Sequence, residues 1–188
     1  MSLAHRKQKK LSLFTITVNP NQMRVFYLSL VTFFSLHCYS QKNIEFSQKD
    51  KTQLKIKVRN DFEKLEITNS KNKQTQIIDH LGTSITGKET HFVTEDYNFD
   101  GYKDFAAYRT DDGMGVYTIY QIFIYNPVNR LFSELKIPAN SSPECDEFCD
   151  VQINKKTKTL QSSCRGGARW HTDSWKFDKN KNLILLKK

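Results

Sequence analysis

The sequence predicts an all-β domain built of antiparallel sheets, arranged as a β-sandwich or like the blade of a propeller. Apolar and polar side chains alternate with a period of two in several short runs, and turn-forming residues separate these runs. No segment of the sequence sustains the longer period of an amphipathic helix. Residues 41–188 are long enough for one domain with a single core.

The first predicted strands carry an alternating pattern. Residues 54–59 alternate apolar with basic side chains, and residues 65–68 alternate in the same way, so both are predicted to be half-buried strands. Residues 75–78 form a further short candidate. Residues 91–93 follow an irregular connection and are rich in β-forming side chains, which predicts another strand.

The longest apolar run after the N-terminal region spans residues 116–125 and predicts the central strand. Both of its faces carry apolar or aromatic side chains, which is typical of a strand covered on two sides. Residues 105–108 precede it as a strand, and residues 131–135 return after an Asn-Pro turn. The remaining predicted strands are residues 149–153, 159–164, 174–177 and 182–186.

One loop between two predicted strands sets oxygen-bearing groups at alternate positions around a glycine. The expected ligands are Asp96, Asn98, Asp100, the carbonyl oxygen of Tyr102, and Asp104. Hard oxygen ligands of this kind suit Ca²⁺, and Gly101 permits the sharp turn of an EF-hand-like loop. Ala107 stands where an EF-hand has its last glutamate, so we expect a calcium loop inserted between strands. The alternative is an Asx-rich turn that binds no metal.

The N-terminal region, residues 1–40, predicts a leader. Residues 25–36 are an apolar run of signal-peptide length that follows Arg24, and the run is too short to span a membrane comfortably. We interpret residues 1–22 as an over-extended start or a dispensable extension of the leader, and residues 23–40 as the signal peptide. Small and polar residues then predict cleavage near Ser40 and Gln41, so we expect a periplasmic or secreted protein.

A lipid anchor on Cys38 is the rival interpretation of the leader. Lipoprotein signals have a small residue before the modified cysteine, whereas this chain has the bulky His37 there. We therefore expect a cleaved signal peptide and no membrane span in the mature chain.

The net charge of the chain is +9, but five basic residues and no acidic residue precede position 41. The expected mature chain therefore carries +4 (9 − 5), spread over strands and turns. Such a distribution lacks the focused basic surface of a nucleic-acid-binding protein, so we do not expect nucleic acid as a partner.

Three cysteines remain in the expected mature chain, and an oxidising compartment favours one disulfide among them. If residues 149–153 and 159–164 fold as a hairpin, Cys149 lies opposite Cys164, which makes this the preferred pair. A link between Cys145 and Cys164 is the competing possibility. Zinc binding is less favoured, because zinc sites usually have two close pairs of ligands.

No motif of a known catalytic class occurs in the sequence: there is no nucleophile elbow, metalloprotease helix or phosphate-binding loop. Asp111 and Asp112 are adjacent, and adjacent side chains of extended backbone point apart, which argues against a glycosidase pair. We do not expect an enzyme.

The acidic loop, which leads directly into a strand, resembles the calcium loop of FG-GAP-type repeats. Only one copy is present, so a complete propeller is excluded. A closer resemblance covers residues 91–188 and includes the acidic loop, the tyrosine-rich strand, Arg165-Gly166-Gly167-Ala168 and Trp175-Lys176-Phe177. These features resemble small bacterial periplasmic proteins whose characterised members inhibit lysozyme-like peptidoglycan hydrolases as immunity proteins and are structurally similar to inhibitors of invertebrate-type lysozyme. The resemblance implies an antiparallel β domain with a structural Ca²⁺, whose exposed loops plug the hydrolase cleft.

A lysozyme-class cleft holds two carboxyl groups, so an inhibitor needs protruding hydrogen-bond donors. The candidate interface residues are Arg165, Gly166, Gly167, Arg169, Trp170 and His171 in one loop, and Asp112 and Gly113 in another. The arginines and His171 are suitable donors, the glycines allow close backbone approach, and Trp170 is a suitable anchor. One alternative is a basic turn with Trp170 in the core. Another is a carbohydrate- or cell-surface-binding module in which Trp170, Trp175 and the tyrosines are stacking platforms.

Overall fold

The computed structural model describes residues 43–59 and 63–186, and these residues contain strands and no helix. The all-β prediction is confirmed. The strands are β1 (Asn43–Ser47), β2 (Gln53–Arg59), β3 (Lys64–Asn69), β4 (Thr75–Asp79), β5 (His91–Glu95), β6 (Asp104–Thr110), β7 (Thr118–Asn126), β8 (Leu131–Glu134), β9 (Phe148–Cys149), β10 (Gln152–Asn154), β11 (Thr159–Gly166), β12 (Arg169–Phe177) and β13 (Leu183–Leu186).

The expected leader, including Cys38 and the cleavage site near Ser40 and Gln41, lies outside the described residues. The described part of the chain has no helix long and apolar enough to cross a membrane.

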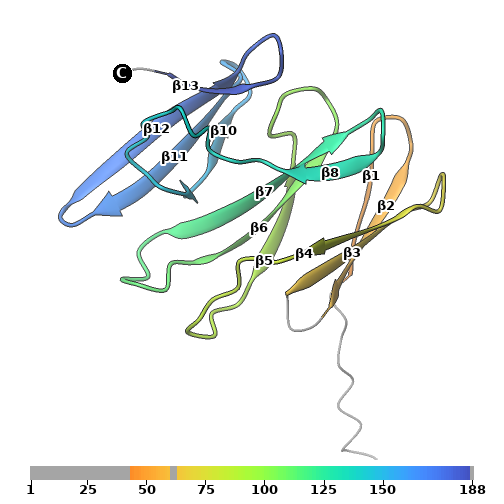
Figure 1. Ribbon diagram of the computed structural model, residues 1–188, viewed down its shortest axis with the longest axis horizontal. Helices are drawn as coiled ribbons and strands as arrows, with labels where there is room; N and C mark the ends of the chain where they lie inside the picture. The colour runs from red at the N-terminus through yellow and green to blue at the C-terminus, as the bar shows by residue number, and fades with distance from the viewer. Residues whose placement is uncertain (1–42, 60–62, 187–188) are drawn as a thin grey trace, which may run out of the picture. The chain divides into compact units, whose positions relative to one another are not determined.

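The strands form three antiparallel sheets that follow one another along the chain (Figure 1). The first sheet has the order β1-β2-β3-β4, the second has the order β5-β6-β7-β8, and the third has the order β10-β11-β12-β13. The short strand β9 pairs with β7 and so belongs to the second sheet. Each sheet is thus a meander of hairpins, and β9 makes the one pairing among the described strands that joins distant parts of the sequence.

The second sheet is buried on both faces. On one face, Phe123 and Tyr125 of β7 join a cluster that includes Ile56 and Leu65 of the first sheet. On the other face, Ile122 of β7 joins a second cluster, which includes Leu160, Trp175 and Leu183 of the third sheet. Alternate residues of β7 thus enter two cores, as predicted for a central strand with two apolar faces.

Several strands differ from those expected from sequence. β1 was not predicted, because its alternation rests on Ile44 and Phe46 alone. β7 begins at Thr118, so the apolar residues Val116 and Tyr117 precede the strand. β12 begins at Arg169, well before the predicted start at Ser174.

The disulfide joins Cys145 and Cys164, whose Cα atoms lie 5.8 Å apart. The predicted pair of Cys149 and Cys164 is therefore wrong, and the competing link is the one formed. Asp150 adopts a left-handed conformation with φ 40°, which turns the chain out of the β10–β11 ladder. Cys149 pairs instead with Ile119 of β7 and remains a buried free thiol.

Candidate functional site

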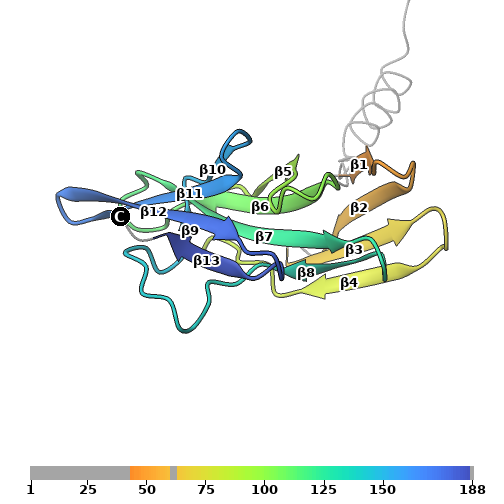
Figure 2. The ribbon, with the colours of Figure 1, turned by 90° about the horizontal axis from the view of Figure 1, so that it is seen from above.

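The β11–β12 hairpin carries most of the predicted interface residues. Its register places Cys164 opposite His171, Arg165 opposite Trp170, and Gly166 opposite Arg169. β10 pairs with residues 159–161 only, and β13 pairs with residues 174–177 only. Within the described chain, no third strand pairs with the outer half of the hairpin, and Figure 2 shows it extending past β10 and β13.

The tip of the hairpin is a two-residue turn formed by Gly167 and Ala168. Gly167 has φ 62°, which is the left-handed value that a type II′ turn requires at its first central residue. The Nε of Arg165 donates a hydrogen bond to the carbonyl oxygen of Gly167, 3.1 Å away. The interface residues expected in one loop are therefore strand residues of β11 and β12, except for Gly167, which lies in the two-residue turn between them.

Trp170 lies on the surface, with 53% of the residue exposed, so it is not the core residue of the alternative interpretation. Arg165 stands directly opposite it, and directly opposite residues of an antiparallel pair share one face. Neither Arg165 nor Arg169 forms a salt bridge with another described residue. Tryptophan and arginine are the side chains enriched at the energetic centre of protein interfaces, and this surface carries both.

The base of the hairpin is fastened to the preceding segment at three points. The disulfide between Cys145 and Cys164 is the first. Asp173, which is buried, accepts hydrogen bonds from the backbone N–H groups of Glu144 at 3.1 Å and Cys145 at 2.9 Å. His171 Nδ1 lies 2.8 Å from Glu144 Oε2. These bonds hold the hairpin base in one position, which reduces the ordering cost of binding.

Sequence reasoning missed Glu144 and Asp173. Asp173 lies just before the predicted strand of residues 174–177, and its inward position follows from the earlier start of β12, which places it on one face with His171 and the fully buried Trp175. An acidic residue at an inward position needs hydrogen-bond donors, and the segment that contains Cys145 supplies them.

The second predicted interface loop follows β6 and contains Asp112 and Gly113. The Asp112 carboxylate accepts hydrogen bonds from the hydroxyl groups of Ser84 and Thr86 and from the N–H of Ile85, and it forms an ion pair with Arg109 at 3.1 Å. These interactions lower the pKa of Asp112, and the hydrogen bonds from Ser84 and Thr86 have the largest effect. Asp112 therefore joins two loops at one end of the second sheet, residues 81–90 and 111–117.

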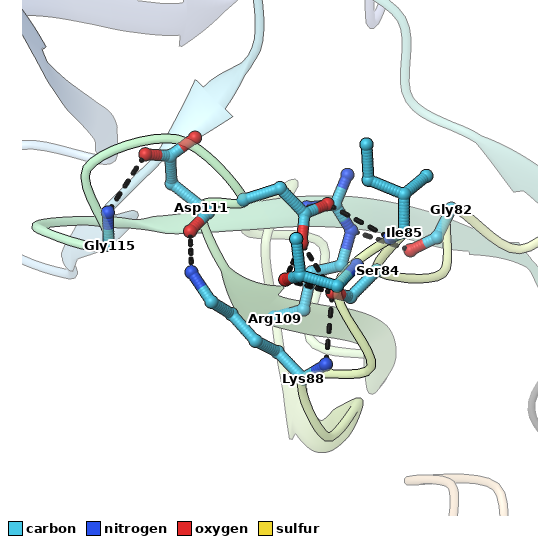
Figure 3. A network of polar contacts seen from close by, with 9 residues as sticks. Gly82, Ser84, Ile85, Lys88, Arg109, Asp111 and Gly115 are labelled. Atoms are coloured by element: carbon cyan, nitrogen blue, oxygen red, sulfur yellow. Dashed lines mark hydrogen bonds and ion pairs between the residues drawn. The ribbon is translucent and has the colours of Figure 1, made fainter.

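Further bonds strengthen this junction. Lys88 Nζ donates to the carbonyl oxygen of Asp111, and Asp111 Oδ2 accepts from the N–H of Gly115 at 3.2 Å (Figure 3). Tyr117, at the end of the loop, packs against the cluster of Cys145, Cys149 and Cys164. The structure thus places the end of the Asp112 loop beside the base of the hairpin, whereas Asp112 itself is engaged within its own network.

The acidic loop connects β5 and β6 and is curled by bonds to its own backbone. Asp96 accepts from the N–H groups of Asp100 at 3.0 Å and Gly101 at 2.8 Å. Asn98 Oδ1 accepts from Asp100 N–H at 3.1 Å, and Asp100 Oδ1 accepts from Tyr102 N–H at 2.9 Å. The structure therefore brings the first three predicted ligands together around one turn.

The loop also holds a strained backbone. Phe99 has φ 60° and Gly101 has φ 85°, and a bulky residue in the left-handed region is rare and costs energy. The packing of the Phe99 side chain against the second core cluster, between the second and third sheets, offsets this cost. The strain is thus maintained by the surrounding structure.

Asp104 takes a different position from the other acidic residues. It is fully buried, and its two oxygens accept from the N–H groups of Tyr97 and Tyr125, each at 2.8 Å. Burial raises the pKa of this carboxyl to about 7, although the backbone hydrogen bonds act in the opposite direction. Asp104 therefore fastens the start of the loop to β7.

The donor set fits Ca²⁺ in chemistry, because it consists of carboxylate, amide and carbonyl oxygens at alternate positions. In geometry, the described residues contain no group of three or more Asp, Glu, His or Cys side chains arranged to hold a metal. Asp100 also lies 3.8 Å from the ammonium of Lys181, and its carbonyl oxygen lies 3.4 Å from that of Lys49. Calcium binding stays a prediction, to be tested by titration.

No protein-family model matches the chain, and neither curated proteins nor solved structures include a significant match.

Proposed function

We propose that this chain is an exported β protein that binds and inhibits a lysozyme-like peptidoglycan hydrolase in the periplasm or outside the cell. The β11–β12 hairpin is the inhibitory element. Its tip enters the substrate cleft, where Arg165 pairs with a catalytic carboxyl group and Trp170 packs beside it, while Arg169 contacts the cleft from the opposite face of the hairpin.

The observation that carries this proposal is the exposed Trp170 beside arginines that form no salt bridge with another described residue, on a hairpin that extends past its neighbouring strands. A cleft inhibitor must protrude and must keep its shape when it binds. The disulfide at Cys164 and the bonds of Asp173 supply this stiffness at the base of the hairpin. The family resemblance of residues 91–188 supports the same target class.

Ca²⁺ is the proposed structural ion of the acidic loop. Asp96, Asn98, Asp100, Tyr102 and Asp104 supply the oxygen ligands, and the bound ion holds the β5–β6 connection in its strained conformation. The ion has no part in contacting the hydrolase, since none of these residues belongs to the hairpin.

The second candidate function is a calcium-organised module that binds carbohydrate at the cell surface. Trp175 cannot serve as a stacking platform, because it is fully buried. Trp170 is exposed and favours this candidate, since an aromatic ring on a surface can stack on a sugar.

One pull-down experiment separates the two functions. The tagged protein is incubated with purified peptidoglycan alone, with an invertebrate-type lysozyme alone, and with an exported bacterial lysozyme-class hydrolase alone. The inhibitor function predicts a one-to-one complex with a hydrolase in the absence of glycan. Binding to peptidoglycan and to neither hydrolase would establish the carbohydrate-binding function and overturn the proposal.

Trp170→Ala and Arg165→Ala are the variants that test the hairpin. Each is expected to weaken the complex at least tenfold, which corresponds to about 1.4 kcal/mol, because both side chains belong to the proposed centre of the interface. Ile184→Ala is the matched control, since Ile184 is an exposed apolar residue of the same sheet outside the hairpin. Equal affinity of all three variants would exclude the hairpin as the binding element.

A further inference from the structure

The three described cysteines form one packed cluster at the base of the β11–β12 hairpin. Cys145, Cys149 and Cys164 are all buried, and Tyr117 and Ile119 pack against them. Cys145 and Cys164 form the disulfide, and Cys149 keeps a free thiol. A free thiol packed against a disulfide has the composition needed for thiol–disulfide exchange.

The register of β10 and β11 indicates which residue would stand opposite Cys164 if the pairing extended further. β10 and β11 pair Gln152 with Gln161 and Ile153 with Leu160. If this register continued toward the start of β10, Cys149 would stand opposite Cys164. Directly opposite residues of an antiparallel pair have Cα atoms about 4.5–5.5 Å apart, within the range of disulfides.

Two contacts hold Cys149 away from this register. The N–H of Asp150 donates to the carbonyl oxygen of Thr118 at 2.9 Å, and the Asp150 carboxylate accepts from the N–H and hydroxyl of Thr118, each at 2.7 Å. Cys149 nevertheless stays beside β11, because its N–H donates to Ser162 Oγ at 2.8 Å. Cys149 thus lies between β7 and β11, two residues along β11 from Cys164.

We infer that the cluster holds two exchangeable disulfides, the Cys145–Cys164 bond and an alternative Cys149–Cys164 bond. The Cys149 thiolate attacks the sulfur of Cys164, a new S–S bond forms, and the bond to Cys145 breaks. Cys145 leaves as a thiolate and takes up the proton that Cys149 released. The number of thiols and disulfides is unchanged, so the step needs no oxidant or reductant.

The exchange changes how the hairpin is anchored. In the observed structure, the disulfide links Cys164 to the segment of Glu144 and Cys145. Asp173 and His171 of β12 bind the same segment. In the alternative bond, Cys164 is tied to β9, and the covalent link to that segment is lost. The cluster is therefore a device that sets the stiffness of the hairpin base.

Burial keeps the exchange slow near neutral pH. The pKa of the Cys149 thiol is raised to about 12, first by desolvation and then by nearby acidic residues, so very little thiolate is present. Since the thiolate is the nucleophile, the rate should rise about tenfold per pH unit below this pKa.

The test uses the full chain with Cys38→Ser, which removes the fourth cysteine. The protein is held without oxidant at pH 7 and at pH 9, and free thiols are alkylated with iodoacetamide at intervals. Cleavage after Glu147 separates the peptides of Cys145 and Cys149 for mass spectrometry. We expect label to appear on Cys145, about a hundredfold faster at pH 9 than at pH 7, at a rate independent of protein concentration. Label confined to Cys149 at both pH values would overturn the inference.

Variants provide a second measurement. Cys145→Ser is expected to form the Cys149–Cys164 disulfide on exposure to air, whereas Cys149→Ser keeps the Cys145–Cys164 bond. Asp150→Gly accommodates the left-handed backbone but removes the carboxylate that binds Thr118, so it should exchange at least tenfold faster than the parent protein. Two free thiols in a Cys145→Ser protein that keeps its near-ultraviolet circular dichroism would contradict the inference. If this variant does not fold, the alkylation experiment on the Cys38→Ser protein decides.

Discussion

Asp104 is the residue on which the acidic loop depends, because one buried side chain fastens the loop to β7. Its oxygens accept N–H groups from Tyr97 and from Tyr125, which are distant in sequence. Replacement by a side chain with one acceptor would leave a buried N–H unpaired, at a cost of about 1–3 kcal/mol.

The raised pKa of Asp104 predicts a specific pH dependence in calcium-free buffer. The pKa rises from an ordinary value near 3.8 to about 7, so the folded state keeps a proton that the unfolded state loses. This contribution to the free energy of unfolding is complete below pH 4 and is lost as the pH rises through 7, by up to about 1.4 kcal/mol per pH unit. Urea unfolding between pH 5 and pH 8 measures it.

Asp104→Asn is the comparison, because the amide does not titrate. The variant should be less stable at pH 5 but should lack the decline of the wild-type protein toward pH 8. Added Ca²⁺ favours the carboxylate and should reduce the decline of the wild-type protein alone. Parallel profiles of the two proteins would show that Asp104 does not titrate in this range.

The positive charge of Lys181 is expected to lower the calcium affinity of the acidic loop. The Lys181 ammonium lies 3.8 Å from Asp100 Oδ2, where it competes with a divalent cation for the same oxygen. Lys181→Gln should therefore raise the calcium affinity about two- to fivefold, the range set by an exposed ion pair. Calorimetric titration measures this change, and Lys179→Gln in the same turn is the control. A lower affinity in the Lys181 variant would contradict the proposed position of the ion.

At the scale of the elements, we predict that loss of Asp112 loosens only the two loops that it joins. Asp112→Ala removes the acceptor shared by Ser84, Thr86 and Arg109, so residues 81–90 and 111–117 should separate. Hydrogen exchange of these segments should accelerate at least tenfold, while exchange in β6 and β7 stays slow. Asp146→Ala, at an exposed position, is the control. Unchanged exchange in residues 81–90 would show that the network does not hold the loops together.

The sequence predicted the elements whose patterns are local. The alternation of residues 54–59 and the apolar run of residues 116–125 correspond to β2 and β7. β12 was underestimated at its N-terminal end, because Arg169 to Thr172 lack apolar alternation and depend on pairing with β11. Gly166-Gly167 was the available signal, since a glycine with positive φ is what a tight hairpin requires.

The disulfide shows what local pattern cannot determine. The hairpin register alone places Cys149 opposite Cys164, and the residues of β10 and β11 do pair in that register. The deciding contacts are those of Asp150 with Thr118, which is distant in sequence. The predicted interface residues of the hairpin are adjacent in the structure, but Glu144 and Asp173, which hold it, became visible only through their contacts.

At the scale of the whole molecule, the second sheet is the shared layer of two cores. Ile122 and Phe123 are neighbours in β7 and point into different clusters, so the first and third sheets depend on opposite faces of one strand.

This arrangement predicts that both residues are essential to stability. Ile122→Ala should reduce the free energy of unfolding by about 2–5 kcal/mol and Phe123→Ala by about 3–5 kcal/mol, because each leaves a cavity in a different core. Ile184→Ala, at an exposed position, should change it by less than about 1 kcal/mol. Urea denaturation measures all three. A cost below about 1 kcal/mol for either buried residue would show that its face of the sheet is not packed.

The proposed function depends on the hairpin as a cleft inhibitor, and an inhibition titration tests it most directly. The exported hydrolase or the invertebrate-type lysozyme digests peptidoglycan while wild-type protein or Trp170→Ala is added in increasing amounts. We predict that wild-type protein abolishes hydrolysis at a one-to-one ratio and that Trp170→Ala needs at least tenfold more protein. Full hydrolysis by both enzymes in the presence of excess wild-type protein would contradict the account.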